Sequence, residues 1–264
     1  MISTTAATLN PSKGEEEAAN TYFPSWIQTL CPEVAAHFGK FPYFQQVIND
    51  LPTMTTLSAA HLVCSMSLAR QIASSIGAPL YLYAGSHLGA IVHGGPIPWD
   101  DDGDLLLPHG KKNSFLEACN RLNDTLPMIY PDILEIKCHD KALLATKLVI
   151  VTADSVMTAK DWEWPFVDIF SYVINQNGTE DSKSKGKIQE VCTEGLPRTQ
   201  RYLVSTFFPT EPYYFGGLHL LGPSQTIARK RYRAKKCVLG SYVHRLEQWV
   251  YNTTCARLSS LNGT

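Results

Sequence analysis

Residues 83–108 read YAGSHLGAIVHGGPIPWDDDGDLLLP and join two short apolar segments. The first segment, Pro79–Ala84, is crowded with aromatic and aliphatic residues and bracketed by Gly and Pro, which predicts a buried strand. Gly85-Ser86 follows at once and predicts a strand-to-helix turn before a short helix at His87–Val92. The second segment, Asp104–Leu107, predicts another strand behind a loop rich in Gly and Pro.

The acidic run at the start of this second strand is the first candidate site. Asp102 and Asp104 lie two apart, so both side chains face one side of a strand. Such close like charges repel in a partly dry site unless a divalent cation neutralises them, and we expect Mg²⁺, with Mn²⁺ as the substitute. Asp168 in PFVDIF is expected as the third ligand, from a neighbouring strand. Carboxylates of this kind support in-line displacement at phosphorus. The alternative is a solvated acidic turn, because Asp-Gly pairs commonly form turns.

Two further features point to an anion. The backbone N–H groups and the hydroxyl of Gly85 and Ser86 could bind a phosphate at a helix N-terminus, although the same residues also suit a plain turn. Six basic residues lie within eight positions near the C-terminus, among them Arg229, Arg231 and Arg233. Their guanidinium groups match the oxygens of a pyrophosphate, and the alternative is a solvated helix face.

Composition narrows the function classes. The chain has 264 residues, 44% of them apolar and 18% charged, as in globular proteins. A formal charge of -1 leaves no bulk field for DNA, RNA or an acidic membrane surface. The best apolar run, Ala142–Ala153, contains Lys147 and is too short to span a bilayer. Met1–Asn20 shows no secretory or transit signal, so we expect a cytoplasmic protein.

The seven cysteines are odd in number, scattered and never arranged as CxxC. This pattern indicates neither a disulfide framework nor a zinc site, and we interpret most of them as buried thiols.

Elsewhere, apolar residues recur at three- and four-residue steps over Thr56–Ile76, which predicts a core-facing helix that Gly77 ends. Residues 1–20 are expected to be a flexible N-terminus and residues 21–264 a single domain of the α/β (α+β) class. The other expected elements are a helix at Lys111–Leu122, strands at Ile133–Lys137, Ala142–Thr152 and Phe166–Ile174, a polar loop at Asn175–Lys187, a basic helix at Thr226–Cys237 and an amphipathic helix at Tyr242–Cys255.

The segment 83–108 resembles the signature of the LicD/fukutin family, in which a Gly-Ser or Gly-Thr turn precedes LLGA, a basic pair and IPWDDDIDI. PFVDIF looks like the second acidic motif of that family, and FGGLHLLGP, residues 215–223, resembles its C-terminal segment. Gly103 stands where the family pattern has Ile or Val. The resemblance implies a nucleotidyltransferase-like fold, a small mixed sheet flanked by helices with C-terminal helical decoration.

The resemblance also implies a function and its residues. Members are similar to enzymes that move a phospho-alcohol, such as phosphocholine, from a CDP-linked donor such as CDP-choline to a hydroxyl of a small molecule or glycan, releasing CMP. The expected metal and catalytic residues are Asp102, Asp104 and Asp168. The expected donor-binding residues are Gly85, Ser86, His93, Trp99, Arg229, Arg231 and Arg233. Two other functions stay open: a glycosyltransferase that uses an acidic DxD pair to bind a sugar nucleotide, and a non-catalytic nucleotide-binding protein.

Overall fold

The computed structural model describes residues 23–40, 54–140, 145–158, 160, 162–180, 187–194, 200–231, 240–244 and 248–251. The helices are α2 (Ser25–Leu30), α3 (Pro32–Lys40), α4 (Thr56–Ser75), α5 (Ala84–His93), η1 (His109–Lys111), α6 (Lys112–Asn123), α7 (Leu126–Ile129), α8 (Val204–Phe207) and α9 (Gln225–Arg231). The strands are β1 (Tyr81–Leu82), β2 (Gly103–Pro108), β3 (Ile133–Asp140), β4 (Thr146–Thr152), β5 (Val156–Met157), β6 (Glu163–Trp164), β7 (Val167–Glu180), β8 (Lys187–Glu194), β9 (Gln200–Leu203), β10 (Glu211–Phe215), β11 (Leu218–Gly222), β12 (Gly240–Val243) and β13 (Gln248–Tyr251). Among these helices, none is long and apolar enough to cross a bilayer. The flexible terminus expected at residues 1–20 lies outside the described residues.

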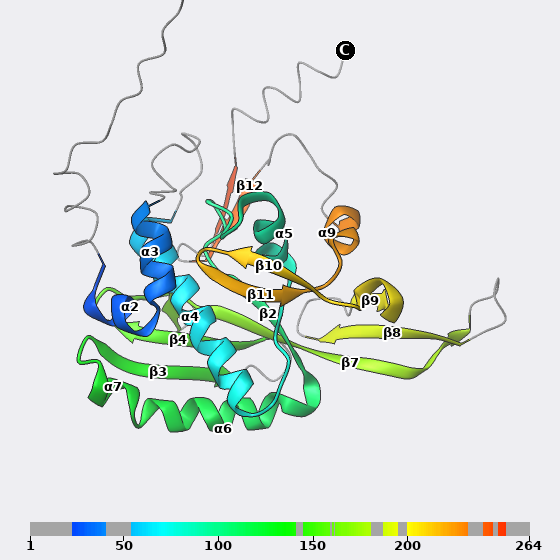
Figure 1. The fold of residues 1–264 in the computed structure, drawn as a ribbon, viewed down its shortest axis with the longest axis horizontal. Coiled ribbons are helices and arrows are strands. Elements are labelled where there is room, and N and C mark those ends of the chain that lie inside the picture. The colour runs from blue at the N-terminus through cyan, green and yellow to red at the C-terminus, as the bar shows by residue number, and fades with distance from the viewer. Residues whose placement is uncertain are drawn as a thin grey trace, which may run out of the picture.

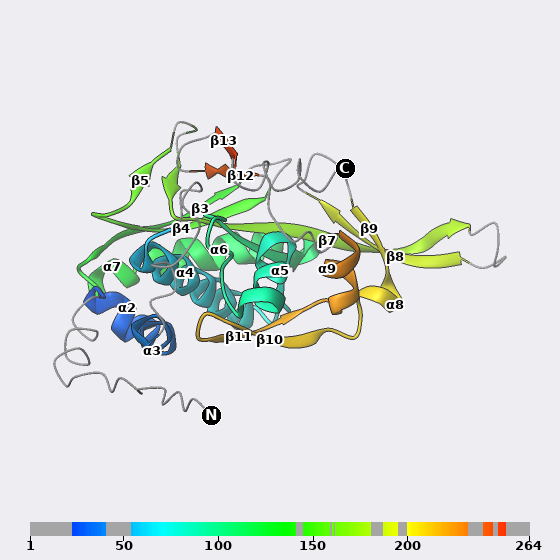
Figure 2. The same cartoon turned by 90° about the horizontal axis from the view of Figure 1, so that it is seen from above.

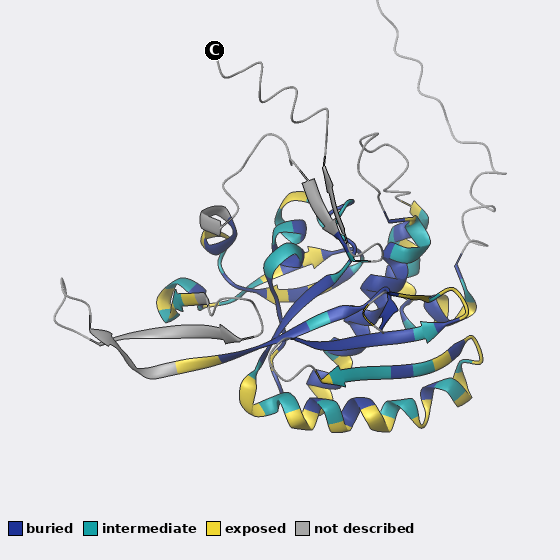
Figure 3. Cartoon of the chain, turned by 180° about the vertical axis from the view of Figure 1, so that it is seen from behind, coloured by how far each residue is buried: buried dark blue, intermediate teal, exposed yellow. Residues whose placement is uncertain are grey.

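A mixed sheet forms the centre of the described structure (Figure 1). Its main path runs β10-β11-β1-β2-β7-β4-β3, and β8 and β9 extend it from β7. The pairs β1–β11 and β2–β7 are parallel, whereas β2 is antiparallel to β1 and β4 is antiparallel to β7. The mixed α/β architecture expected from the sequence is therefore confirmed. The central strands β2 and β7 are almost entirely buried in their shared part (Figure 3).

Helix α4 packs on one face of the sheet, as its apolar spacing predicts. Thr55 caps its N-terminus, because its hydroxyl accepts the Ser58 N–H. Gly77, with φ +59°, ends it: the N–H of Ala78 donates to the carbonyl of Ala73, closing a Schellman motif that needs a left-handed residue. The helix thus ends where the glycine predicts.

The two faces of the sheet carry different cores. The α4 face holds the larger core, to which Leu105 and Ile169 contribute. The opposite face holds a smaller aromatic core in which Leu106 and Phe170 pack against α8 and α9. Side chains two apart on a strand share a face, so Asp104 and Asp168 emerge on the side of the smaller core. In Figure 2 the β12–β13 hairpin lies on the opposite side of β4 and β7 from α4.

Two segments differ from the sequence predictions. Asn175–Lys187 was expected to be a polar loop, but β7 continues to Glu180 and pairs with β8, forming a long hairpin that projects from the body (Figure 1). The helix expected at Tyr242–Cys255 is wrong where the chain is described, because β12 and β13 form an antiparallel pair there. The basic helix expected at Thr226–Cys237 is confirmed as far as Arg231, and its remainder lies outside the described residues.

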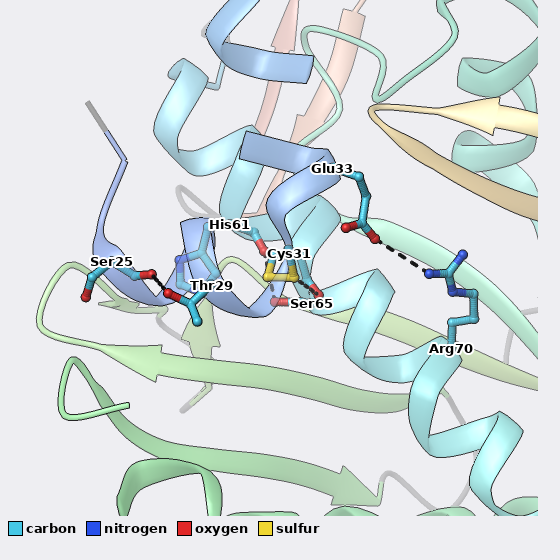
Figure 4. The surroundings of a disulfide bond; sticks show 8 residues. Ser25, Thr29, Cys31, Glu33, His61, Ser65 and Arg70 are labelled. Carbon is cyan, nitrogen blue, oxygen red and sulfur yellow. Dashed lines mark hydrogen bonds and ion pairs between the residues drawn. A yellow bond between two sulfur atoms is a disulfide. The ribbon is translucent and has the colours of Figure 1, made fainter. Parts of the chain in front are cut away.

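The cysteine prediction is wrong for four of the seven residues. Cys31, which precedes α3, forms a disulfide with Cys64 in α4 (Figure 4). Cys119 in α6 forms a second disulfide with Cys138 in β3. The partners lie 33 and 19 residues apart, so only the tertiary fold brings them together. The first bond links the start of α3 to α4, and the second links α6 to β3.

Candidate functional site

Three carboxylates converge where the loop after α5 enters β2. Each of Asp100, Asp102 and Asp104 offers an oxygen, and these oxygens lie within 4.8 Å of one another. Asp104 sits on β2, whereas the other two precede the strand, so the change from loop to strand brings the three side chains together. The acidic strand predicted from the sequence is thus a compact group of oxygen donors, the ligand type that Mg²⁺ and Mn²⁺ prefer.

This group is electrostatically costly on its own. Burial, with the charges of Asp102 and Asp100 added, holds the pKa of Asp104 well above its usual value. Burial and the charge of Asp102 likewise raise the pKa of Asp100 to about 8. Desolvation and like-charge repulsion both disfavour the ionised forms. A divalent cation would remove this penalty, so the residues present fit the metal that the sequence predicts.

Gly85 and Ser86 support the acidic residues directly. The Gly85 N–H donates to Asp104 Oδ2 at 2.8 Å, and the Ser86 hydroxyl accepts the Asp104 N–H at 2.9 Å. A Cβ added at Gly85 would overlap Asp100 Oδ2, so glycine permits this close approach of backbone and carboxylate. The two residues expected at the donor phosphates therefore act, in this structure, on the carboxylate group.

Asp168 lies beside this group on β7. It is the register partner of Asp104 across the parallel β2–β7 pair, and neighbouring partners share a face of the sheet. Its Oδ1 accepts from Lys147 Nζ at 2.6 Å, and that lysine lies 3.6 Å above the Phe166 ring. Burial raises the pKa of Asp168 to about 6, while the charge of Lys147 limits the rise. Asp168 is on the expected face, but it is ion-paired, and Asp100 takes its place in the three-carboxylate group.

His244 covers the other side of the acidic run. Its Nδ1 lies 3.0 Å from Asp101 Oδ1 and its Nε2 lies 3.5 Å from Asp102 Oδ2. Burial alone would lower the pKa of His244, but the charge of Asp102 and the hydrogen bond to Asp101 raise it to about 9. These contacts favour the protonated imidazole, and His244, which directly follows β12, comes from a segment remote in sequence.

The remaining predicted donor-binding residues are placed less completely. His93 is the last residue of α5. Its ring lies edge-on to that of Trp99, with 6.0 Å between the ring centres, and Trp99 belongs to the loop that carries the acidic run. Arg229 and Arg231 belong to α9, which packs against α5, and nothing is described of their side chains. Arg233 lies outside the described residues.

Sequence reasoning missed several residues of this site. Asp100 continues the same period-two spacing one step before Asp102, but it was left out because it lies further from the predicted strand at Asp104–Leu107. Lys147 interrupts an apolar strand, and that interruption was a usable signal, because a buried lysine requires a partner. His244 has no local signal, since its position beside Asp101 is a contact between residues 143 apart in the sequence.

The chain is similar to known proteins in sequence and in fold. A family model described as "LicD/FKTN/FKRP, nucleotidyltransferase domain" matches residues 77–225, more than half of the chain. Among solved structures, the lincosamide antibiotic adenylyltransferase LnuA with bound lincomycin shares 11% identity, with a TM-score of 0.37, and the match covers 72% of this chain and 90% of that one. The search of curated proteins found no match. The region that the family model matches contains the acidic residues, Lys147 and Asp168, but not His244.

Proposed function

The chain belongs to the LicD/FKTN/FKRP family through its nucleotidyltransferase domain, and we propose that it transfers a phospho-alcohol such as phosphocholine from a CDP-linked donor to a hydroxyl group. The acceptor would be a small molecule or a glycan. The single observation that carries this proposal is the convergence of Asp100, Asp102 and Asp104 on one point beside Asp168. Family membership supports a transferase, and the carboxylate group supports chemistry on a phosphoanhydride.

We assign the cation to Asp102 and Asp104, joined by Asp100. Mg²⁺, or Mn²⁺ in its place, would supply charge neutralisation on the donor's pyrophosphate. The protein contributes preorganisation: the Gly85 N–H and the Ser86 hydroxyl hold Asp104 before any ligand arrives. Fixed groups of this kind cost no reorganisation during the reaction.

Asp168 is proposed to orient the acceptor hydroxyl and to take its proton. With a pKa of about 6, it is mostly ionised at neutral pH and still basic enough to receive a proton. The acceptor oxygen attacks the phosphorus that carries the alcohol, the bond from that phosphorus to the bridging oxygen breaks, and CMP leaves with the electron pair. Arg229, Arg231 and Arg233 are proposed to meet the departing phosphate, as Arg forks do in other phosphate sites.

We propose a location other than the expected cytoplasm. Disulfides persist in oxidising compartments and are rare in the cytoplasm. The two disulfides, Cys31–Cys64 and Cys119–Cys138, therefore favour an oxidising compartment over the expected cytoplasmic location.

The direct test is product analysis with the purified full chain. CDP-choline and CDP-ribitol are incubated with Mg²⁺ and a panel of hydroxyl acceptors, and ³¹P NMR follows the appearance of CMP. We expect CMP only with the metal present, and at least a 10³-fold loss in Asp104→Asn, with the exposed Asp124→Asn as the matched control. Absence of CMP with every CDP-alcohol would reject this donor class, and release of UDP or GDP from sugar nucleotides would favour a glycosyltransferase.

A further inference from the structure

His244, which directly follows β12, docks on the acidic run, although it lies outside the region that the family model matches. Strand β12 pairs with β13, and Val243, its last residue, is buried. Burial of Val243 fixes the direction in which the next residue emerges. His244 therefore reaches the loop before β2 from a part of the chain about 140 residues away.

His244 makes a two-point contact with one oxygen. Its backbone N–H donates to Asp101 Oδ1 at 2.9 Å, and its Nδ1 lies 3.0 Å from the same atom. On the other side of the ring, Nε2 lies 3.5 Å from Asp102 Oδ2. The ring also packs edge-on against Phe166, with 5.4 Å between the ring centres. The imidazole is thus held between two consecutive aspartates.

Asp101 is fixed from its backbone as well. Its carbonyl accepts a hydrogen bond from Trp164 Nε1 at 2.7 Å, and its side chain is buried beneath His244. A residue anchored at both its backbone and its carboxylate cannot turn freely. Asp102 follows it directly, so the orientation of Asp102 depends on this anchor.

We propose that His244 is a positioning residue of the nucleotidyltransferase site: it anchors Asp101 and, through it, orients Asp102 for the cation. The site is then completed by the residue that follows β12, from outside the matched domain. This inference rests on the proposed function, because it assumes that Asp102 is a metal ligand. Removing a residue that orients a metal ligand typically lowers the metal affinity 10- to 100-fold.

Two substitutions separate the contacts of the ring. Asparagine at position 244 places an amide N–H near the position of Nδ1 and keeps the bond to Asp101. Glutamine places its amide further out, near the position of Nε2, and loses that bond. His219, exposed on β11, offers the matched control, since its side chain is remote from the contacts described above for the acidic group.

The experiment is a Mn²⁺ titration of the full-length protein followed by electron paramagnetic resonance, which needs no substrate. We expect His244→Ala to weaken Mn²⁺ binding 10- to 100-fold, His244→Asn to stay within about threefold of the unchanged protein, and His219→Ala to have no effect. Thermal melts identify variants that are folded at the titration temperature. A merely structural role would lower the melting temperature of His244→Ala while leaving the Mn²⁺ affinity of the folded protein unchanged.

Each outcome decides the matter. If the unchanged protein binds Mn²⁺ and His244→Ala binds it equally well or more tightly, the positioning role is overturned and the proposed function stands. If the unchanged protein binds no Mn²⁺, the metal assignment and this inference both fail. Should His244→Ala not fold, tighter binding by His244→Asn than by His244→Gln supports the role, and equal affinities overturn it.

Discussion

Replacing Gly85 with alanine perturbs the acidic group through one methyl group. The new Cβ would fall well inside 3.0 Å of Asp100 Oδ2 and 3.1 Å from Asp104 Oδ2. Ordinary contact begins near 3.4 Å, so the Asp100 oxygen must move by about 1 Å, or the turn must open. Because Gly85 has no positive φ, the backbone itself accepts alanine.

The effects on stability and on the site should therefore separate. Gly85 is the second residue of α5, where alanine is favoured over glycine by up to about 1 kcal/mol. Crowding typically costs about 1–3 kcal/mol, so we expect a net loss of about 0–3 kcal/mol in the free energy of unfolding. A displacement of 1 Å in a catalytic arrangement can cost about 100-fold in rate, and we expect Mn²⁺ affinity to fall about 10- to 100-fold.

The assay compares Mn²⁺ affinity, CMP formation and urea unfolding in Gly85→Ala and Gly110→Ala. Gly110 lies in η1, where an added Cβ meets nothing within 4 Å, so it controls for a glycine-to-alanine change as such. We expect the control to match the unchanged protein in metal affinity and turnover. Unchanged Mn²⁺ affinity and turnover in Gly85→Ala would refute the reasoning, because the close approach of Gly85 to the carboxylates would then be irrelevant to the site.

Three other predictions concern the supporting structure. Lys147→Met removes the cation beside Asp168, so the pKa of Asp168 should rise above about 6 and the acidic limb of the kcat/KM profile should move to higher pH; an unmoved limb contradicts the ion pair's role. Double replacement of Cys119 and Cys138 by serine opens a 19-residue loop and should cost about 3 kcal/mol in non-reducing urea unfolding; peptide mapping that finds no linked peptide would remove its basis. Burial lowers the pKa of His61 to about 4 in the folded protein, from 6.5. The unfolded chain therefore binds the proton first, so the free energy of unfolding is highest above pH 6.5 and decreases as the pH falls toward 4. At pH 5 this costs about 2 kcal/mol relative to pH 8, and His61→Gln should lose that much less; an identical pH dependence in urea titrations would contradict it.

The predictable parts of the fold are those with a strong local signal. The three- and four-residue spacing and Gly77 predict α4 correctly, since an amphipathic helix and a left-handed cap are both read within a few residues. The strand beginning near Asp104 is also confirmed. The outer half of β7 was missed, because residues 175–180, NQNGTE, are polar and are typical of a loop in the sequence alone.

Long-range contacts account for the other misses. Cys31 pairs with Cys64 only because the start of α3 packs on α4. The two residues are 33 apart in the sequence, so no local motif predicts the bond. His244 reaches Asp101 by the same kind of tertiary contact, from directly after β12, in a segment that was predicted to be a helix. Gly103 departs from the family pattern, and a Cβ there would lie 3.2 Å from the Met66 sulfur, so a larger side chain requires Met66 to shift by a few tenths of an ångström.

The central claim is that the carboxylates at the start of β2 bind a divalent cation together with the donor. Crystals soaked with Mn²⁺ and CDP-choline, with data collected at the manganese absorption edge, test it most directly. The account predicts an anomalous peak in contact with oxygens of Asp102 and Asp104 and with the donor's pyrophosphate. A peak elsewhere, or a bound nucleotide with no metal at these aspartates, would contradict it.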